Sequence, residues 1–278
     1  MSLSLNETEP APEALLQLYV EWGADEAISE ETADWFAAAG KAETIRPVPA
    51  DPPHVSISQQ TPTAPAEAPK RAPSVPEPPS DKAARALAGT AQTLEELRAA
   101  LESLEGFPLK VTATNLVFGE GVERPEVMFI GEAPGADEDR QGRPFVGASG
   151  RLLDRMMQSI GLDRAENAYI TNILPWRPPG NREPTPAEIA TCLPFIRRHI
   201  ALVKPRLLVP VGGTSAKTLL DQRQGIMRLR GRQFEYTDPA LEAPIPAVPF
   251  FHPAFLLRSA GQKALAWRDL LTIKQIIQ

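Results

Sequence analysis

Four short apolar runs alternate with amphipathic helical patterns from about residue 85 onward, and this alternation limits the possible folds more than any other feature. The apolar runs lie near residues 126–131, 168–173, 206–212 and 246–251. The helical patterns lie near residues 149–160, 186–202, 214–221 and 262–277. Strands that are joined through helices make right-handed crossovers, so the strands run parallel in one sheet and helices cover both faces. We therefore expect a three-layer α/β/α domain with a central four-stranded parallel sheet.

The first third of the chain differs in composition from the rest. Residues 11–40 show an amphipathic helical pattern, whereas residues 47–79 contain 11 prolines and no apolar periodicity, as is typical of a linker. We therefore expect a helical N-terminal segment over residues 1–44, a Pro-rich disordered linker over 45–84 and a globular domain over 85–278. The tethered segment could bind a protein partner or act as a solubility arm, and we favour the partner.

Charge and cysteine content narrow the class of protein. The whole chain has a net charge of −6, but residues 1–100 hold 7 Lys and Arg against 16 Asp and Glu, whereas residues 101–278 hold 22 against 19. The globular domain is weakly basic. This charge is compatible with DNA binding but is not evidence for it. A single cysteine, Cys192, cannot form an internal disulfide and fits a reducing cytoplasm. The sequence shows no apolar run long enough for a membrane span and no signal-peptide pattern.

Polar side chains with useful chemistry follow the ends of three expected strands. Glu132 comes directly after Gly131 at the end of the first strand, Asn172 lies near the end of the second, and His252 ends the last. Phe145 lies in the loop that begins at Glu132. Open α/β sheets bind ligands at the carboxyl ends of their strands. An aromatic ring and a carboxylate suit a flat ring, and an asparagine amide matches a pyrimidine edge with a carbonyl beside a ring N–H.

Each of these residues also has a purely structural interpretation when it is taken alone. An acidic loop is usually a solvated surface turn, a histidine at a strand end is usually structural, and an asparagine there often forms a turn. The presence of all three residue types at the ends of different parallel strands favours one converging site.

Several segments resemble, in order along the chain, the motifs of uracil-DNA glycosylases of the family 4 type. They are LVFGEG (116–121), GEAPG (131–135), GRPFVG (142–147), ITN (170–172), RPPGNR (177–182), LRGR (229–232) and HPAFLLR (252–258). Each motif alone is weak, but the ordered set is specific and spans roughly residues 95–278. The resemblance implies a uracil-DNA glycosylase-like fold and a DNA repair hydrolase. Such an enzyme cleaves the N-glycosidic bond of uracil in DNA and leaves an abasic site.

The resemblance also implies roles for the residues around the base. Phe145 would stack on the flipped uracil, and Asn172 would bind its N3 and O4 edge. A neutral His252 would donate a hydrogen bond to O2 as charge develops there. Glu132 would either position water or stabilise the cationic sugar, and main-chain amides from Gly131 to Ala133 would contact the base. In family 1 enzymes the catalytic aspartate lies at the position of Ala133, so both roles of Glu132 stay open.

Further residues would contact the base edge or the DNA. Glu138 would crowd the C5 edge of the base and exclude the methyl group of thymine. Leu256 and Leu257 would fill the space that the flipped base leaves, and Arg258 would contact a phosphate. Arg230, together with Arg228 and Arg232, either faces DNA phosphates or forms a solvated surface.

The chain departs from the family at an iron–sulfur cluster. Family 4 enzymes typically hold a [4Fe–4S] cluster on four cysteines, which correspond here to Leu104, Phe107, Trp176 and Cys192. One thiolate cannot hold a cluster that needs about four ligands. We therefore expect no cofactor, and we expect hydrophobic packing of Phe107 and Trp176 around Cys192.

Two other functions remain open from the sequence. The protein could bind uracil-containing or otherwise damaged DNA without turnover, or it could act on another deaminated base. The presence of the whole set of site residues favours a catalytic glycosylase, and Asn172 favours uracil. We expect a monomer in the cytoplasm that acts on uracil-containing DNA and has no membrane partner.

Overall fold

The computed structural model describes residues 81–278, so the predictions for residues 1–44 and for most of the linker at 45–84 lie outside the described residues. Helix α3 (Asp81–Thr90) begins within the last four positions of the predicted linker. It is ordered there because Ala84 and Ala88 are buried against α8 (Pro186–Val203). Among the described residues, no helix is long and apolar enough to cross a bilayer.

The sheet contains the four parallel strands that the sequence predicts. They are β2 (Val127–Gly131), β3 (Ala168–Asn172), β4 (Leu207–Pro210) and β6 (Ile245–Ala247). Two short antiparallel edge strands, β1 (Glu120–Gly121) and β5 (Phe234–Tyr236), extend the order to β1-β3-β2-β4-β6-β5. The sequence does not predict either edge strand, because two or three residues are too few to show a periodicity.

Alternate residues of the central strand β2 pack into different layers. Val127 and Phe129 belong to one hydrophobic core, whereas Met128 and Ile130 belong to the core on the other face. Successive side chains of a strand point to opposite faces of the sheet, and a strand covered on both faces is apolar throughout. The burial of all five residues of β2 therefore confirms the three-layer prediction.

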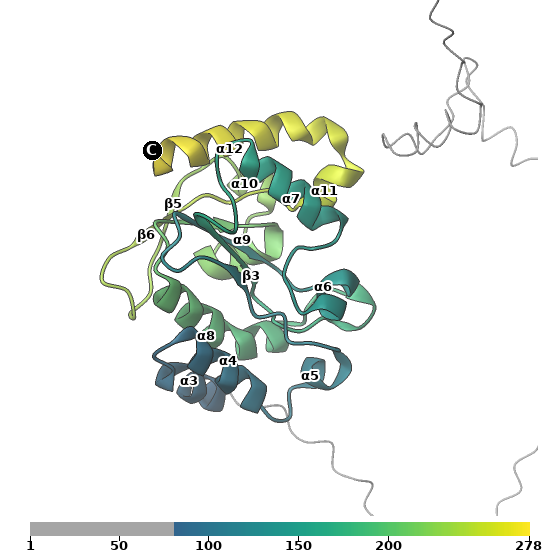
Figure 1. The fold of residues 1–278 in the computed structure, drawn as a ribbon, viewed down its shortest axis with the longest axis vertical. Coiled ribbons are helices and arrows are strands. Elements are labelled where there is room, and N and C mark those ends of the chain that lie inside the picture. The colour runs from purple at the N-terminus through teal and green to yellow at the C-terminus, as the bar shows by residue number, and fades with distance from the viewer. Residues whose placement is uncertain (1–80) are drawn as a thin grey trace, which may run out of the picture. The chain divides into compact units, whose positions relative to one another are not determined.

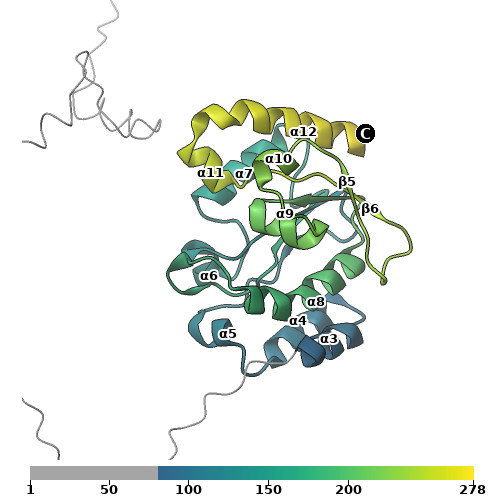
Figure 2. The ribbon, with the colours of Figure 1, turned by 180° about the vertical axis from the view of Figure 1, so that it is seen from behind.

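Helices cover both faces of the sheet (Figures 1 and 2). One layer contains α7 (Ala148–Gln158), α11 (Pro253–Arg258) and α12 (Lys263–Ile277), and the other contains α3, α4 (Leu94–Ser103) and α8. The remaining elements are α5 (Pro108–Thr112), α6 (Ala136–Gln141), η1 (Pro179–Asn181), α9 (Gly213–Leu220), α10 (Ile226–Leu229) and η2 (Ala260–Gln262). The helices predicted near 149–160, 186–202, 214–221 and 262–277 are confirmed as α7, α8, α9 and α12.

Candidate active site

A cavity of about 610 Å³ opens at the carboxyl edge of the parallel sheet. The loops that follow β2, β3, β4 and β6 line it, as expected for an open α/β sheet. Of the residues predicted for the site, those that line the cavity are Glu132, Ala133, Glu138, Phe145, Asn172, His252 and Arg258. The residues predicted from three separate strand ends therefore converge on one space.

Gly131 lies where Asn172 and Phe145 come together. A Cβ atom on Gly131 would lie 2.2 Å from Asn172 Oδ1 and 2.7 Å from Phe145 Cζ. No real Cβ makes such contacts, so any larger residue would displace the amide or the ring. β2 and β3 pair in register here, with Gly131 opposite Asn172. The glycine thus allows the Asn172 amide and the Phe145 ring to share one end of the cavity.

Asn172 has an unusual hydrogen-bonding state. The residue is 4% exposed, and its Oδ1 has no hydrogen-bond partner among the described residues. Buried polar atoms in folded proteins nearly always have a partner, and leaving one unpaired costs about 1–3 kcal/mol. An N–H group from a bound ligand would satisfy this oxygen.

Phe145 is buried and has a strained backbone. Its φ angle of 53° lies in the left-handed region, which costs a non-glycine residue roughly 1–2 kcal/mol. Its carbonyl oxygen packs against Gly150 in α7, where a Cβ would lie only 1.8 Å away. The Phe145 ring lies 5.7 Å from the His252 ring, centroid to centroid, with an interplanar angle of 33°. This conformation brings an aromatic face beside the imidazole.

His252 caps helix α11 and is neutral at physiological pH. Its Nδ1 accepts a hydrogen bond of 3.2 Å from the Ala254 amide, so the ring proton of the neutral form is on Nε2. Burial lowers the pKa of His252 to about 4, and the positive charge of Arg258 lowers it further, against the opposing effect of Glu138. The neutral side chain therefore carries an N–H group on Nε2 that can donate a hydrogen bond.

Glu138 lines the cavity, but its carboxylate is engaged by main-chain amides. Oε1 accepts hydrogen bonds of 2.9 Å from the amides of Val146 and Gly147, and Oε2 accepts one of 3.1 Å from Gly135. Glu138 thus joins the start of α6 to the segment that follows Phe145. This organising function was not visible in the sequence, because the partners depend on how the loop folds back.

Glu132 and Ala133 follow β2 directly and are partly exposed in the cavity. The main chain here continues the pairing with β3, since the Glu132 carbonyl accepts a hydrogen bond of 3.0 Å from the Leu174 amide. The Glu132 carboxylate therefore starts from a main chain that is held by the sheet.

The residues predicted to contact DNA fall into different environments. Leu256 is fully buried in the core, whereas Leu257 is 44% exposed and Arg258 is exposed at the cavity. Of the two leucines, only Leu257 is accessible at the surface. Arg230 donates from Nε to Asp269 Oδ2 at 2.8 Å, and its side chain is 14% exposed. Arg230 therefore forms an ion pair within the fold, because the buried Asp269 needs a counter-charge. Its guanidinium is not available to contact DNA phosphates.

The four residues that the resemblance assigns to the cluster positions do not fit an iron–sulfur cluster. Leu104, Phe107, Trp176 and Cys192 are all buried in one hydrophobic core. The rings of Phe107 and Trp176 lie 5.4 Å apart, centroid to centroid, and three of the four side chains offer no metal ligand. Burial strongly raises the pKa of the Cys192 thiol, so the fold favours its neutral form. Within residues 81–278, no group of three or more His, Cys, Asp and Glu side chains is placed to hold a metal.

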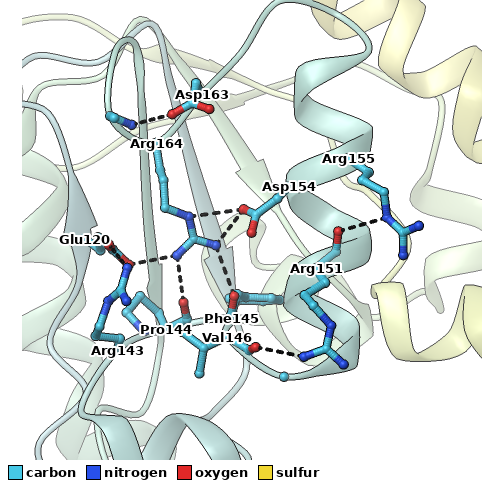
Figure 3. Close-up of polar contacts among 12 residues, drawn as sticks. Glu120, Arg143, Pro144, Phe145, Val146, Arg151, Asp154, Arg155, Asp163 and Arg164 are labelled. Carbon is cyan, nitrogen blue, oxygen red and sulfur yellow. Dashed lines mark hydrogen bonds and ion pairs between the residues drawn. The ribbon is translucent and has the colours of Figure 1, made fainter.

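Other residues at the site were missed from the sequence. Asn181 and Arg182 also line the cavity; they belong to the RPPGNR motif, which could have suggested a function for them. Arg164 does not line the cavity, but it donates to the carbonyls of Pro144 and Phe145 (Figure 3). No local pattern could have identified Arg164, because its partners lie 19 and 20 positions away in the chain.

The fold and the cavity together define a class: an α/β/α protein with a cavity at the carboxyl edge of its sheet whose lining suits a flat polar ring. An aromatic face, a buried amide and a neutral imidazole line the same space.

Comparison with known proteins defines the family. Residues 118–271 match the uracil DNA glycosylase superfamily, and the chain belongs to it. A type-4 uracil-DNA glycosylase of Sulfurisphaera tokodaii is 35% identical over 189 residues, which cover 66% of this chain and 84% of that protein. Type-4 enzymes of Archaeoglobus fulgidus and Thermotoga maritima are 38% and 35% identical, over 60% and 62% of this chain and 84% and 88% of their own lengths.

Proposed function

We propose that this protein hydrolyses the N-glycosidic bond of uracil in DNA and leaves an abasic site. The observation that carries the proposal is the buried Asn172 amide, whose Oδ1 lacks a partner among the described residues. This amide shares a cavity with the Phe145 ring and the neutral His252. Membership of the superfamily and the similarity to type-4 enzymes support the same reaction.

Base selection would depend on Asn172. Uracil presents an N3–H donor beside the O4 acceptor, so the Asn172 amide can accept from N3 and donate to O4. Cytosine presents an N3 acceptor beside an amino group, which would leave polar groups unpaired against the same amide orientation. The Phe145 ring would stack on the face of either base, so the discrimination would come from the amide.

Bond cleavage requires charge stabilisation at both ends of the breaking bond. The base leaves as an anion, and the His252 Nε2–H would donate to its O2 atom. The sugar becomes cationic, and Glu132 would stabilise it or position the attacking water. A histidine with a pKa of about 4 stays neutral during this process, so the site gains a donor without having to desolvate a cation.

Access to a base in duplex DNA requires that the nucleotide leave the stack. We assign Leu257 as the apolar side chain that fills the vacated space and Arg258 as a phosphate contact, because both are exposed and Arg258 lines the cavity. A domain charge near +3 would give modest electrostatic attraction to DNA.

We further propose that the reaction proceeds without an iron–sulfur cluster, since Leu104, Phe107 and Trp176 offer no ligands. We also propose that the protein acts as a monomer. A lone reduced cysteine, Cys192, is consistent with a cytoplasmic location.

The decisive experiment is excision from oligonucleotides that contain one uracil. Single-stranded and duplex forms are incubated with the full-length protein, and abasic sites are then cleaved with alkali. We expect strand cleavage at uracil and none at cytosine or thymine in matched oligonucleotides. Asn172→Ala and His252→Ala should each lower the rate by roughly 10²–10³-fold, the usual loss when one transition-state donor is removed.

Two outcomes would contradict the proposal. Tight binding of uracil DNA with no abasic product would indicate a non-catalytic binding protein. Cleavage at another deaminated base, with uracil left intact, would indicate a different specificity.

A further inference from the structure

The conformation of Phe145 needs support from outside its own segment. Its φ of 53° is unfavourable for an aromatic residue, yet this conformation places its ring beside His252. A strained conformation persists only where surrounding contacts hold it. The contacts that hold the peptide groups around Phe145 therefore control the position of the ring.

Arg164 holds the two carbonyl groups at this point. The residue lies in the loop between α7 and β3, and its side chain is 14% exposed. Nη1 donates to the Pro144 carbonyl and Nη2 to the Phe145 carbonyl, each at 3.0 Å (Figure 3). Both acceptors flank the Cα of the strained residue, so one guanidinium holds the peptide groups on both sides of it.

The guanidinium is itself fixed by two carboxylates. Nη1 donates to Glu120 Oε2 at 2.8 Å, and Nη2 and Nε donate to Asp154 Oδ1 at 2.6 and 3.1 Å (Figure 3). Glu120 comes from β1 and Asp154 from α7. The planar fork of an arginine can serve acceptors in several directions, whereas a lysine offers one nitrogen.

Glu138 holds the next two peptide groups. Its Oε1 accepts from the amides of Val146 and Gly147 at 2.9 Å. The carbonyls of residues 144 and 145 thus bind a cation, and the amides of residues 146 and 147 bind an anion. Gly150 completes the arrangement, because only a glycine leaves room for the Phe145 carbonyl.

We infer that Arg164 is a positioning residue for uracil excision, which acts by holding Phe145 in the left-handed conformation that places its ring against the base. This inference rests on the proposed function. Arg164 does not line the cavity, so its effect on the reaction passes through the Phe145 main chain and not through contact with the substrate.

The test uses Arg164→Gln in the full-length protein. Misplacement of a substrate-contacting group by about 1 Å can lower a rate about 100-fold. We expect the single-turnover excision rate to fall by about 10- to 100-fold and inhibition by free uracil to weaken. Affinity for an otherwise identical duplex without uracil should change less than twofold, because Arg164 is not presented to DNA. Arg164→Lys should recover only part of the rate.

A double-mutant cycle with Phe145→Ala separates positioning from general stability. If Arg164 acts through the Phe145 ring, adding Arg164→Gln to Phe145→Ala should lower the rate by less than twofold more. Multiplied losses in the double variant would overturn the inference, as would an Arg164→Gln protein that excises uracil at the wild-type rate. If Arg164→Gln does not fold, Asp154→Asn provides the test, because it removes one of the two carboxylates that fix the guanidinium. Asp154→Asn should lower the excision rate in the wild-type background but not in the Phe145→Ala background.

A matched control is Arg198→Gln. Arg198 also donates to a main-chain carbonyl, that of Ala91, at 2.7 Å, but it does not line the cavity. The Arg198→Gln variant should have a lower thermal stability and an unchanged excision rate. A rate loss equal to that of Arg164→Gln would overturn the inference. Absence of excision by the wild-type protein would refute the proposed function instead, so the two failures are distinguishable.

Discussion

Acidification should destabilise the folded protein through His252, because the fold accommodates its neutral form. The pKa of His252 is lowered to about 4 by burial and by Arg258, whereas an unfolded histidine titrates near 6.5. Between these values the unfolded chain binds more protons than the folded chain. The free energy of unfolding therefore has its full value above pH 6.5 and falls as the pH drops towards 4.

The size of the effect follows from the two pKa values. A difference of about 2.5 units, at 1.36 kcal/mol per unit, gives at most about 3 kcal/mol once the pH is below both values. Partial titration gives about 1.4 kcal/mol at pH 5.5 and about 2.6 kcal/mol at pH 4.5. His199 is fully buried with a pKa lowered to about 3 by burial and by Arg98, so it adds to the loss over the same pH range.

The contribution of His252 can be isolated with His252→Gln. Urea unfolding is followed by tryptophan fluorescence at pH 7.0, 5.5 and 4.5 for the wild type and the variant. We expect the variant to lose less stability on acidification than the wild type, by about 2 kcal/mol between pH 7.0 and 4.5. His199 and the carboxylates are present in both proteins, so their contributions cancel in this difference.

Parallel losses in the two proteins would refute the reasoning. They would mean that His252 titrates near its ordinary pKa in the folded state, so that it would be partly charged near pH 6.5. The neutral Nε2–H donor assigned to uracil excision would then also be wrong under mildly acidic conditions.

Three further outcomes are expected. Gly131→Ala should lower the excision rate at least about 100-fold and the free energy of unfolding by about 1–3 kcal/mol, because its Cβ would overlap Asn172 and Phe145; a wild-type rate would contradict the cavity geometry. Leu257→Ala should slow excision from duplex DNA by about tenfold and from single strands much less, since only a duplex has a stack to fill; equal losses would contradict its assignment as a wedge. Anaerobically purified protein should be colourless and lack stoichiometric iron by elemental analysis; visible cluster absorbance with iron would contradict the cofactor proposal.

Local periodicity was sufficient to predict the layers of the fold. The run at Val127–Ile130 is apolar at every position because helices cover both faces of β2, and such a strand must lie in the middle of an α/β/α arrangement. The same reasoning located Glu132 and Asn172 correctly at the ends of β2 and β3, and parallel strands end at the same edge of a sheet. His252 was predicted to end the last strand, but β6 ends at Ala247 and His252 instead caps α11, because the segment between them forms only an isolated bridge at Phe250. Their convergence on one cavity was therefore predictable from the sequence.

The tertiary structure alone decided which way individual side chains face and what they bind. Leu256 and Leu257 are equivalent in composition, but the packing of α11 buries the first and exposes the second. The left-handed conformation of Phe145 depends on Arg164, whose partners lie 19 and 20 positions away in the chain. A sequence pattern indicates which face of a helix or strand is buried on average. The hydrogen-bond partner of one side chain depends on segments that come into contact only when the chain folds.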